Sequence, residues 1–189
     1  DRMTSNTRSI HEEDTTPQSQ LAAEILAAAE PVQVLVSGLD PRNVPLTWAP
    51  EVLDAFTKME KIAASGRLLM TGRAAEAGVW EAERFATPAD WLAKQQGTTA
   101  GRARADLETS QRLGGLDATA DAVREGRLSP EQAGAIADAA AVNPDAERDL
   151  LARAQQDSLR RTRQEAERRK AEVRSEEEKA ARDKKVRDE

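Results

Sequence analysis

The fold is decided by two segments, Thr87-Pro-Ala-Asp-Trp-Leu-Ala-Lys-Gln-Gln-Gly97 and Ala122-Val-Arg-Glu-Gly-Arg-Leu-Ser-Pro-Glu-Gln-Ala133. In each segment a short helical pattern ends at a glycine, which is the residue that most readily ends a helix. A threonine or serine after that glycine can cap the next helix. Thr87, which opens the first segment, and Ser129 are each followed by proline, which suits the first helical position. The pattern is typical of the helix–turn–helix motif and occurs twice.

Working outward from these segments, we predict an all-α fold with about six or seven helices. Residues 32, 34 and 36 are valines that alternate as in a β-strand, but no second strand is available, so residues 31–50 are either a helix continuation or an extended loop. Three prolines make residues 40–50 a linker. The helices are expected at 17–30, 51–77, 88–97, 99–113, 117–125, 129–140 and from Pro144 to the end.

The chain is expected to divide into three parts: a disordered N-terminus (1–16), a helical domain (17–151) and a charged helical extension or linker (152–189). The extension is the long charged C-terminal helix of the predicted fold. Oppositely charged residues four positions apart support it, as in Asp157–Arg161 and Glu165–Arg169. One apolar residue recurs every seven positions along this helix: Leu159, Ala166, Val173 and Ala180. A coiled coil normally has two apolar positions in each seven, so this seam is weak evidence for self-association.

The composition argues against catalysis within this chain. There is no cysteine and one histidine, His11, so zinc–thiolate sites and multi-histidine metal sites are excluded. No glycine-rich phosphate loop occurs. We therefore expect no catalytic residue, no metal ligand and no cofactor. No apolar run is long enough for a membrane span, and we expect a cytoplasmic protein without a membrane partner. The chain begins with Asp1 and stops within a charged helical pattern, and we expect both ends to be truncated.

The charge is uneven along the chain. The formal net charge is −6, but residues 152–189 contain 13 basic and 10 acidic residues, a net of +3. The rest of the chain therefore carries −9. An acidic body with a mildly basic tail differs from the basic excess of most nucleic-acid-binding domains.

Several arginines nevertheless occupy positions at which a helix–turn–helix motif would contact DNA. With Gly97 at the turn, Arg102, Arg104 and Arg112 point outward from the second helix, where side chains meet DNA phosphates or guanine edges. The alternative interpretation is a plain helical hairpin with solvated arginines. The second unit resembles a short segment of ParB-like partition proteins and offers Arg127, but a packing unit explains it as well. On the C-terminal helix, Arg160, Arg161 and Arg163 are candidate contacts to the DNA backbone.

The order of several short motifs resembles a known family. These are Gly78-Val-Trp80, Trp91-Leu-Ala93, Gly97-x-x-x-Gly101-x-Ala103, Gly126-Arg-Leu-Ser129-x-x-Gln132-Ala133 and Leu150-Leu-x-x-Ala154. Their spacing over residues 50–189 resembles the actinobacterial domain-of-unknown-function 222 family, also called the 13E12 repeat family. In that family the domain usually precedes an HNH endonuclease domain. The resemblance implies association with DNA, and it implies no catalytic residue in this chain because no HNH residues are present; a full-length protein could carry the nuclease.

The sequence therefore predicts a non-catalytic, DNA-associated helical module of an HNH-endonuclease-type protein. The alternative is a protein–protein interaction or self-association module without direct DNA contact. Self-association would use the C-terminal helix.

Overall fold

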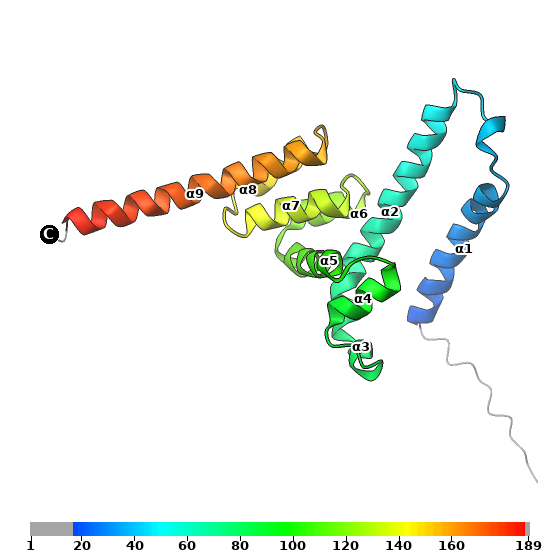
Figure 1. Ribbon diagram of the computed structural model, residues 1–189, viewed down its shortest axis with the longest axis horizontal. Coiled ribbons are helices and arrows are strands. Elements are labelled where there is room, and N and C mark those ends of the chain that lie inside the picture. The colour runs from blue at the N-terminus through cyan, green and yellow to red at the C-terminus, as the bar shows by residue number, and fades with distance from the viewer. Residues whose placement is uncertain (1–16, 188–189) are drawn as a thin grey trace, which may run out of the picture. The chain divides into compact units, whose positions relative to one another are not determined.

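The computed structural model describes residues 17–187, and this range is helical without a β-strand (Figure 1). It confirms the all-α prediction and the long C-terminal helix, but it contains nine α-helices where six or seven were expected. The residues predicted to be disordered, 1–16, lie outside the described range. The α-helices are α1 (Pro17–Ser37), α2 (Ala49–Glu76), α3 (Val79–Ala82), α4 (Pro88–Gln96), α5 (Ala100–Arg112), α6 (Asp117–Arg124), α7 (Pro130–Ala140), α8 (Ala146–Ala154) and α9 (Leu159–Arg187).

The chain divides into two compact units, Asp1–Pro50 and Glu51–Glu189. In the first unit, α1 continues past Pro31 to Ser37, which is the helix continuation that the sequence left open for the residues after 30. Proline inside a helix removes one backbone hydrogen bond and crowds the preceding turn, and α1 accommodates this at Pro31. The alternating valines are thus helical. A short 3₁₀ helix, η1 (Pro41–Asn43), follows, and the Asp40 carboxylate caps it by accepting from the Arg42 N–H.

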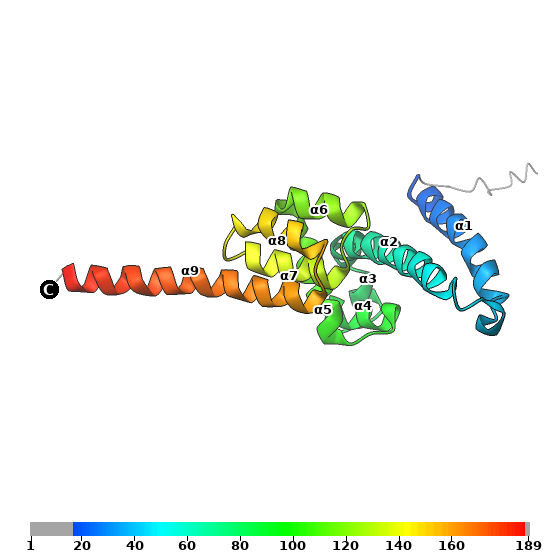
Figure 2. The ribbon, with the colours of Figure 1, turned by 90° about the horizontal axis from the view of Figure 1, so that it is seen from above.

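The second unit is built around α7. This helix packs against α5, α6, α8 and α9, and Figure 2 shows it beside α8 and α9. Leu128, Ala133, Ile136 and Leu150 are fully buried in its main core. A smaller cluster joins α4 to α5 through Leu92, Ala93, Ala103 and Leu107.

Most helix ends follow the sequence signals. Thr87, Thr99 and Ser129 cap α4, α5 and α7, each accepting a hydrogen bond from a backbone N–H three residues later. Gly97 ends α4 and Gly126 follows α6, both with positive φ. These predictions are confirmed because capping depends on residues close in sequence.

The prediction of one helix from Pro144 to the end was wrong. The chain leaves the helix after Ala154 and begins α9 at Leu159. No glycine or proline marks this break. Instead, the Gln132 side chain donates to the Ala154 carbonyl oxygen at 2.7 Å, and so satisfies the end of α8 from another helix. The break lets α8 and α9 both pack on α7.

None of the described helices combines the length and the apolar character that crossing a membrane requires.

Candidate nucleic-acid interface

The first predicted helix pair, α4 and α5, packs as expected. Gly97 adopts the left-handed conformation at the end of α4, and the Thr99 hydroxyl accepts from the Arg102 N–H at the start of α5. Ala93, Ala103 and Leu107 are buried between the two helices. Short helices held at a tight turn in this way leave the far side of α5 exposed.

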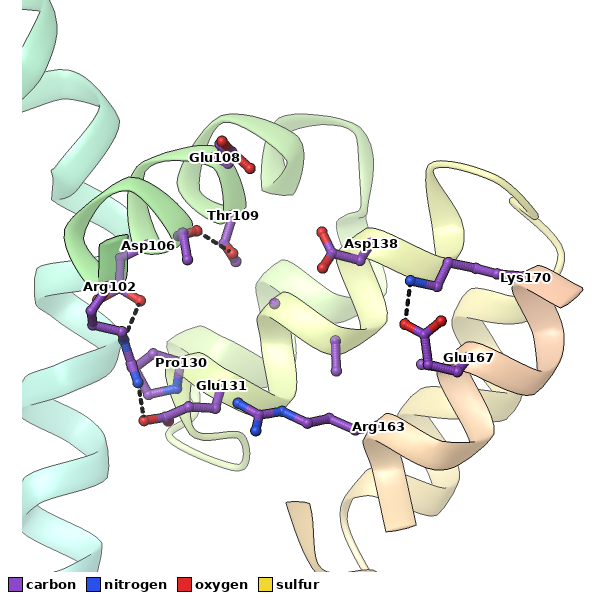
Figure 3. A pocket seen from close by; sticks show the side chains of 14 residues that line it. Arg102, Asp106, Glu108, Thr109, Pro130, Glu131, Asp138, Arg163, Glu167 and Lys170 are labelled. Atoms are coloured by element: carbon purple, nitrogen blue, oxygen red, sulfur yellow. Dashed lines mark hydrogen bonds and ion pairs between the residues drawn. The ribbon is translucent and has the colours of Figure 1, made fainter. Parts of the chain in front are cut away.

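Arg102 does not lie on that exposed side. Its guanidinium Nε donates to Asp106 Oδ1 at 3.0 Å, and its Nη1 forms a close ion pair with Glu131 on α7 (Figure 3). The Arg102 side chain is 32% exposed and the Asp106 side chain is 8% exposed. Arg102 therefore fixes α5 to α7, and its charge is neutralised by two carboxylates.

The same contact shifts both titrations. The hydrogen bond from Arg102 lowers the pKa of Glu131 to about 2, against the opposing effect of burial. Correspondingly, the hydrogen bond to Glu131 raises the pKa of Arg102. This pair therefore remains ionised at all pH values near neutrality.

Three further predicted DNA contacts are also engaged within the chain. Arg112 forms a close ion pair with Asp138 and lies 3.8 Å from Glu108. Arg127 Nε donates to Glu125 Oε2 at 2.5 Å, and Arg161 lies 3.4 Å from Asp157. These pairs are partly or largely exposed, so they hold the side chains weakly.

The remaining three predicted contacts are exposed and form no ion pair within the described part of the chain: Arg104 on α5, and Arg160 and Arg163 on α9. Arg104 lies on the outer side of α5, which is the side available to a duplex in a helix–turn–helix. The structure thus separates the seven arginines into four that are ion-paired and three that are not.

A hollow of about 310 Å³ lies where α5, α7 and α9 meet (Figure 3). It brings Arg163 near the residues around Arg102 and Glu131, but acidic side chains outnumber basic ones in its lining. A cavity with this balance does not favour phosphate. Its charged lining residues are Arg102, Asp106, Glu108, Glu131, Asp138, Arg163, Glu167 and Lys170.

The second predicted helix–turn–helix, α6 with α7, has no surface for DNA on its second helix. Asp138 is the one exposed residue of α7, and it is acidic. Ala133, Ile136 and Ala137 are fully buried by the surrounding helices. The helix α7 is therefore a packing helix, in line with the alternative left open by the sequence.

Sequence reasoning missed a second hollow, of about 360 Å³, in which basic side chains predominate. Lys58 and Lys61 of α2 line it together with Arg127 from the turn after α6, while Asp54 is its one acidic lining residue. Thr57, Gly126 and Gln155 complete the lining. We refer to Lys58, Lys61 and Arg127 as the basic cluster. Lys58 and Lys61 are three residues apart and so share a helix face, a signal that the sequence offered; the approach of Arg127 was not visible there.

No group of three or more possible metal-ligating side chains is assembled among the described residues. His11 lies outside them.

Comparison with family models, curated proteins and solved structures finds no match to this chain.

Proposed function

We propose that this chain is a non-catalytic helical module that contacts the phosphate backbone of duplex DNA, within a protein of the HNH-endonuclease type. The basic cluster is the observation that carries the proposal. Lys58, Lys61 and Arg127 surround one hollow with a single carboxylate among the lining residues.

The chemistry of the cluster suits phosphate. Lysine supplies a compact positive charge with three rotatable donors, and arginine supplies a planar set of N–H groups. Arg127 remains 39% exposed beside Glu125, so an incoming phosphate can compete for it. Contacts of this type fix a protein on the duplex without reading its sequence.

The exposed arginines extend this surface chemistry. Arg104 is placed on the outer side of α5, and Arg160 and Arg163 begin the long charged helix α9. Because the chain as a whole is acidic, we expect binding that is weak and strongly dependent on salt. The assignment beside an HNH nuclease rests on the family resemblance in residues 50–189.

The test is the anisotropy of a labelled duplex of about 30 base pairs, titrated with the chain at several salt concentrations. With three phosphates contacted, the logarithm of the binding constant should fall with the logarithm of salt with a slope of about −3. The variant Lys58→Glu/Lys61→Glu should bind at least about tenfold more weakly at low salt, because it reverses two of the three charges.

The matched control is Lys179→Glu/Lys184→Glu, which makes the same change in net charge on an exposed part of α9. It should lose much less affinity than the cluster variant. Equal losses would show that net charge alone governs binding, and absence of binding by the wild-type chain at low salt would refute the proposal.

The alternative function is a protein–protein interaction or self-association module without direct DNA contact. Its self-association would use the seam of the C-terminal helix, whose residues recur every seven positions. Ala166 of that seam is buried in the core of the same chain, so it cannot also meet a partner. Leu159 and Val173 are half-buried and Ala180 is exposed, so the accessible positions are interrupted by a buried one and are insufficient for a coiled coil. This route to self-association is therefore not favoured.

A further inference from the structure

An apolar surface that the proposed function does not use lies on the first unit. In α1 and the residues after it, large aliphatic side chains are exposed to between 42% and 71%. Among the described residues of α1, Glu24 and Glu30 are the charged ones. A helix that is apolar around most of its circumference is stable when another element covers it. The exposed side chains are Leu21, Ile25, Leu26, Val34, Leu35, Val36 and Leu39.

The order of these residues limits what can cover them. Leu21, Ile25, Ala28, Val32, Leu35 and Leu39 are separated by four, three, four, three and four residues. This is the spacing of a coiled-coil seam, in which side chains of one helix fit between those of another. We call these six residues the α1 seam.

The spacing of the residues in the α1 seam is the same from either end of the seam. When two copies are placed antiparallel about a two-fold axis, Ile25 meets Leu35 and Ala28 meets Val32 within the two helices. Leu21 lies opposite Leu39, which follows the end of the other helix at Ser37. Every layer of the seam then finds an apolar residue opposite. A self-complementary surface of this kind is what a two-fold dimer requires.

We infer that α1 is a dimerisation helix and that its partner is the α1 of a second copy of this chain, in antiparallel orientation. Charge agrees with this pairing. In the antiparallel register, the position opposite Glu24 is Val36, and the position opposite Glu30 is Glu30 itself, which lies off the seam on the outer face. The antiparallel seam therefore contains no like-charged pair.

The available area fits a small interface with a second copy. Four of the seven exposed aliphatic side chains belong to the α1 seam, and at roughly 100 Å² each they offer roughly 400 Å² per chain. Standard complexes bury about 800 Å² on each partner, and weak ones bury less. We therefore expect a dimer whose population depends on concentration.

The first experiment measures molar mass by analytical ultracentrifugation from about 1 to 200 µM of the full chain. The wild-type mass should rise toward twice the chain mass with concentration. The variant Ile25→Glu/Leu35→Glu should remain a monomer throughout, because it places four carboxylates in one apolar seam.

The control is Gln20→Glu/Gln33→Glu, which adds the same charge to the same helix but off the seam. It should dimerise like the wild type. Circular dichroism at the highest concentration of each variant checks that α2–α9 remain folded. A wild-type chain that is monomeric at 200 µM would overturn the inference, as would equal loss of dimer in both variants.

Orientation is tested by cross-linking, since the chain contains no cysteine of its own. A mixture of Ala28→Cys and Val32→Cys chains should form the mixed disulfide in preference to either symmetric one. Preferential symmetric disulfides would indicate parallel helices and refute the antiparallel pairing.

Flotation with phosphatidylcholine vesicles tests whether a lipid surface, and not a second chain, binds the apolar side chains of α1. A chain that is monomeric and floats with the vesicles would assign α1 to a lipid surface and refute the dimer.

Discussion

Arg102 and Glu131 are 29 residues apart in the chain, and their ion pair joins α5 to α7. Asp106 accepts a second hydrogen bond from the same guanidinium, so the arginine satisfies two carboxylates near the core. Side chains of this kind are strongly coupled to folding, because removing one partner leaves the other charge poorly compensated. At the scale of single residues, this makes Arg102 a structural side chain.

The coupling predicts a pH dependence of stability. The pKa of Glu131 is about 2 in the folded chain and near 4.5 when unfolded. Because the folded value is lower, the pair stabilises the fold fully above about pH 4.5 and loses this contribution as the pH falls toward 2. In Glu131→Gln we expect a lower urea midpoint than in the wild type at pH 6, and a difference that shrinks below pH 4.5 and is still partly present at pH 3.

The control for this prediction is Glu60→Gln, which removes an exposed carboxylate that forms no ion pair with a described residue. Its urea midpoints should run parallel to those of the wild type between pH 6 and pH 3. If Glu131→Gln also ran parallel, the ion pair would make no contribution that depends on pH.

Which arginines are available to a ligand could not be predicted from the sequence. Arg102 and Arg104 both follow the turn at Gly97, and their spacing alone places both on the second helix of the pair. The distinction arises from Glu131, which is distant in sequence and reaches Arg102 but not Arg104. The basic cluster is a similar case, since Lys58 and Arg127 meet through the fold. Local patterns identify helices and their ends, whereas long-range contacts decide the site.

At the scale of helices, the same contrast explains which boundaries were predicted. Ser129 and Pro130 begin α7 as expected because the capping groups are adjacent in sequence. The break after Ala154 was missed because its stabilising group, the Gln132 side chain, comes from another helix. Gln132 thus has two roles: its Oε1 accepts from the Ser129 N–H, and its Nε2 donates to the Ala154 carbonyl oxygen.

Replacing Gln132 by alanine removes both contacts. The Ala154 carbonyl lies in a buried residue and loses its side-chain donor, which costs about 1–3 kcal/mol of unfolding free energy. Urea unfolding at neutral pH measures the loss. Gln111→Ala on the exposed side of α5 is the control and should change stability by less than about 0.5 kcal/mol. Equal effects of the two substitutions would show that the link between α7 and α8 is not stabilising.

The turn between α6 and α7 depends on the closeness of α2. Gly126 has φ +66°, and a Cβ atom there would lie 2.9 Å from Ile62 Cγ1. Gly97 has φ +63° but open space around its Cβ position. Both alanine variants therefore incur the left-handed backbone cost of roughly 1–2 kcal/mol, whereas Gly126→Ala must also displace Ile62.

We expect Gly126→Ala to lose at least about 1 kcal/mol more unfolding free energy than Gly97→Ala, which is the lower limit for overpacking a close contact. Chemical denaturation of the two variants side by side measures the difference. Equal losses would mean that Ile62 moves aside without cost and that α2 is loosely held at this turn.

At the scale of the whole molecule, the core belongs to the second unit. Both hydrophobic clusters lie within residues 51–189, while no residue of the first unit from 20 to 50 is buried. Apolar burial is the main source of folding stability, so residues 51–189 have what an independently folding domain needs. The first unit has apolar side chains but not a core of its own, which is consistent with a helix that folds against a partner.

A chain that begins at Glu51 should therefore keep a single cooperative urea transition, because it retains both clusters. We expect it to lose the rise in molar mass with concentration, because it lacks α1. Loss of the cooperative transition would show that the core itself needs residues 1–50. A truncated chain that still dimerises would place the self-association surface outside α1. Duplex binding by the same truncated chain should persist, since Lys58, Lys61 and Arg127 all lie in residues 51–189.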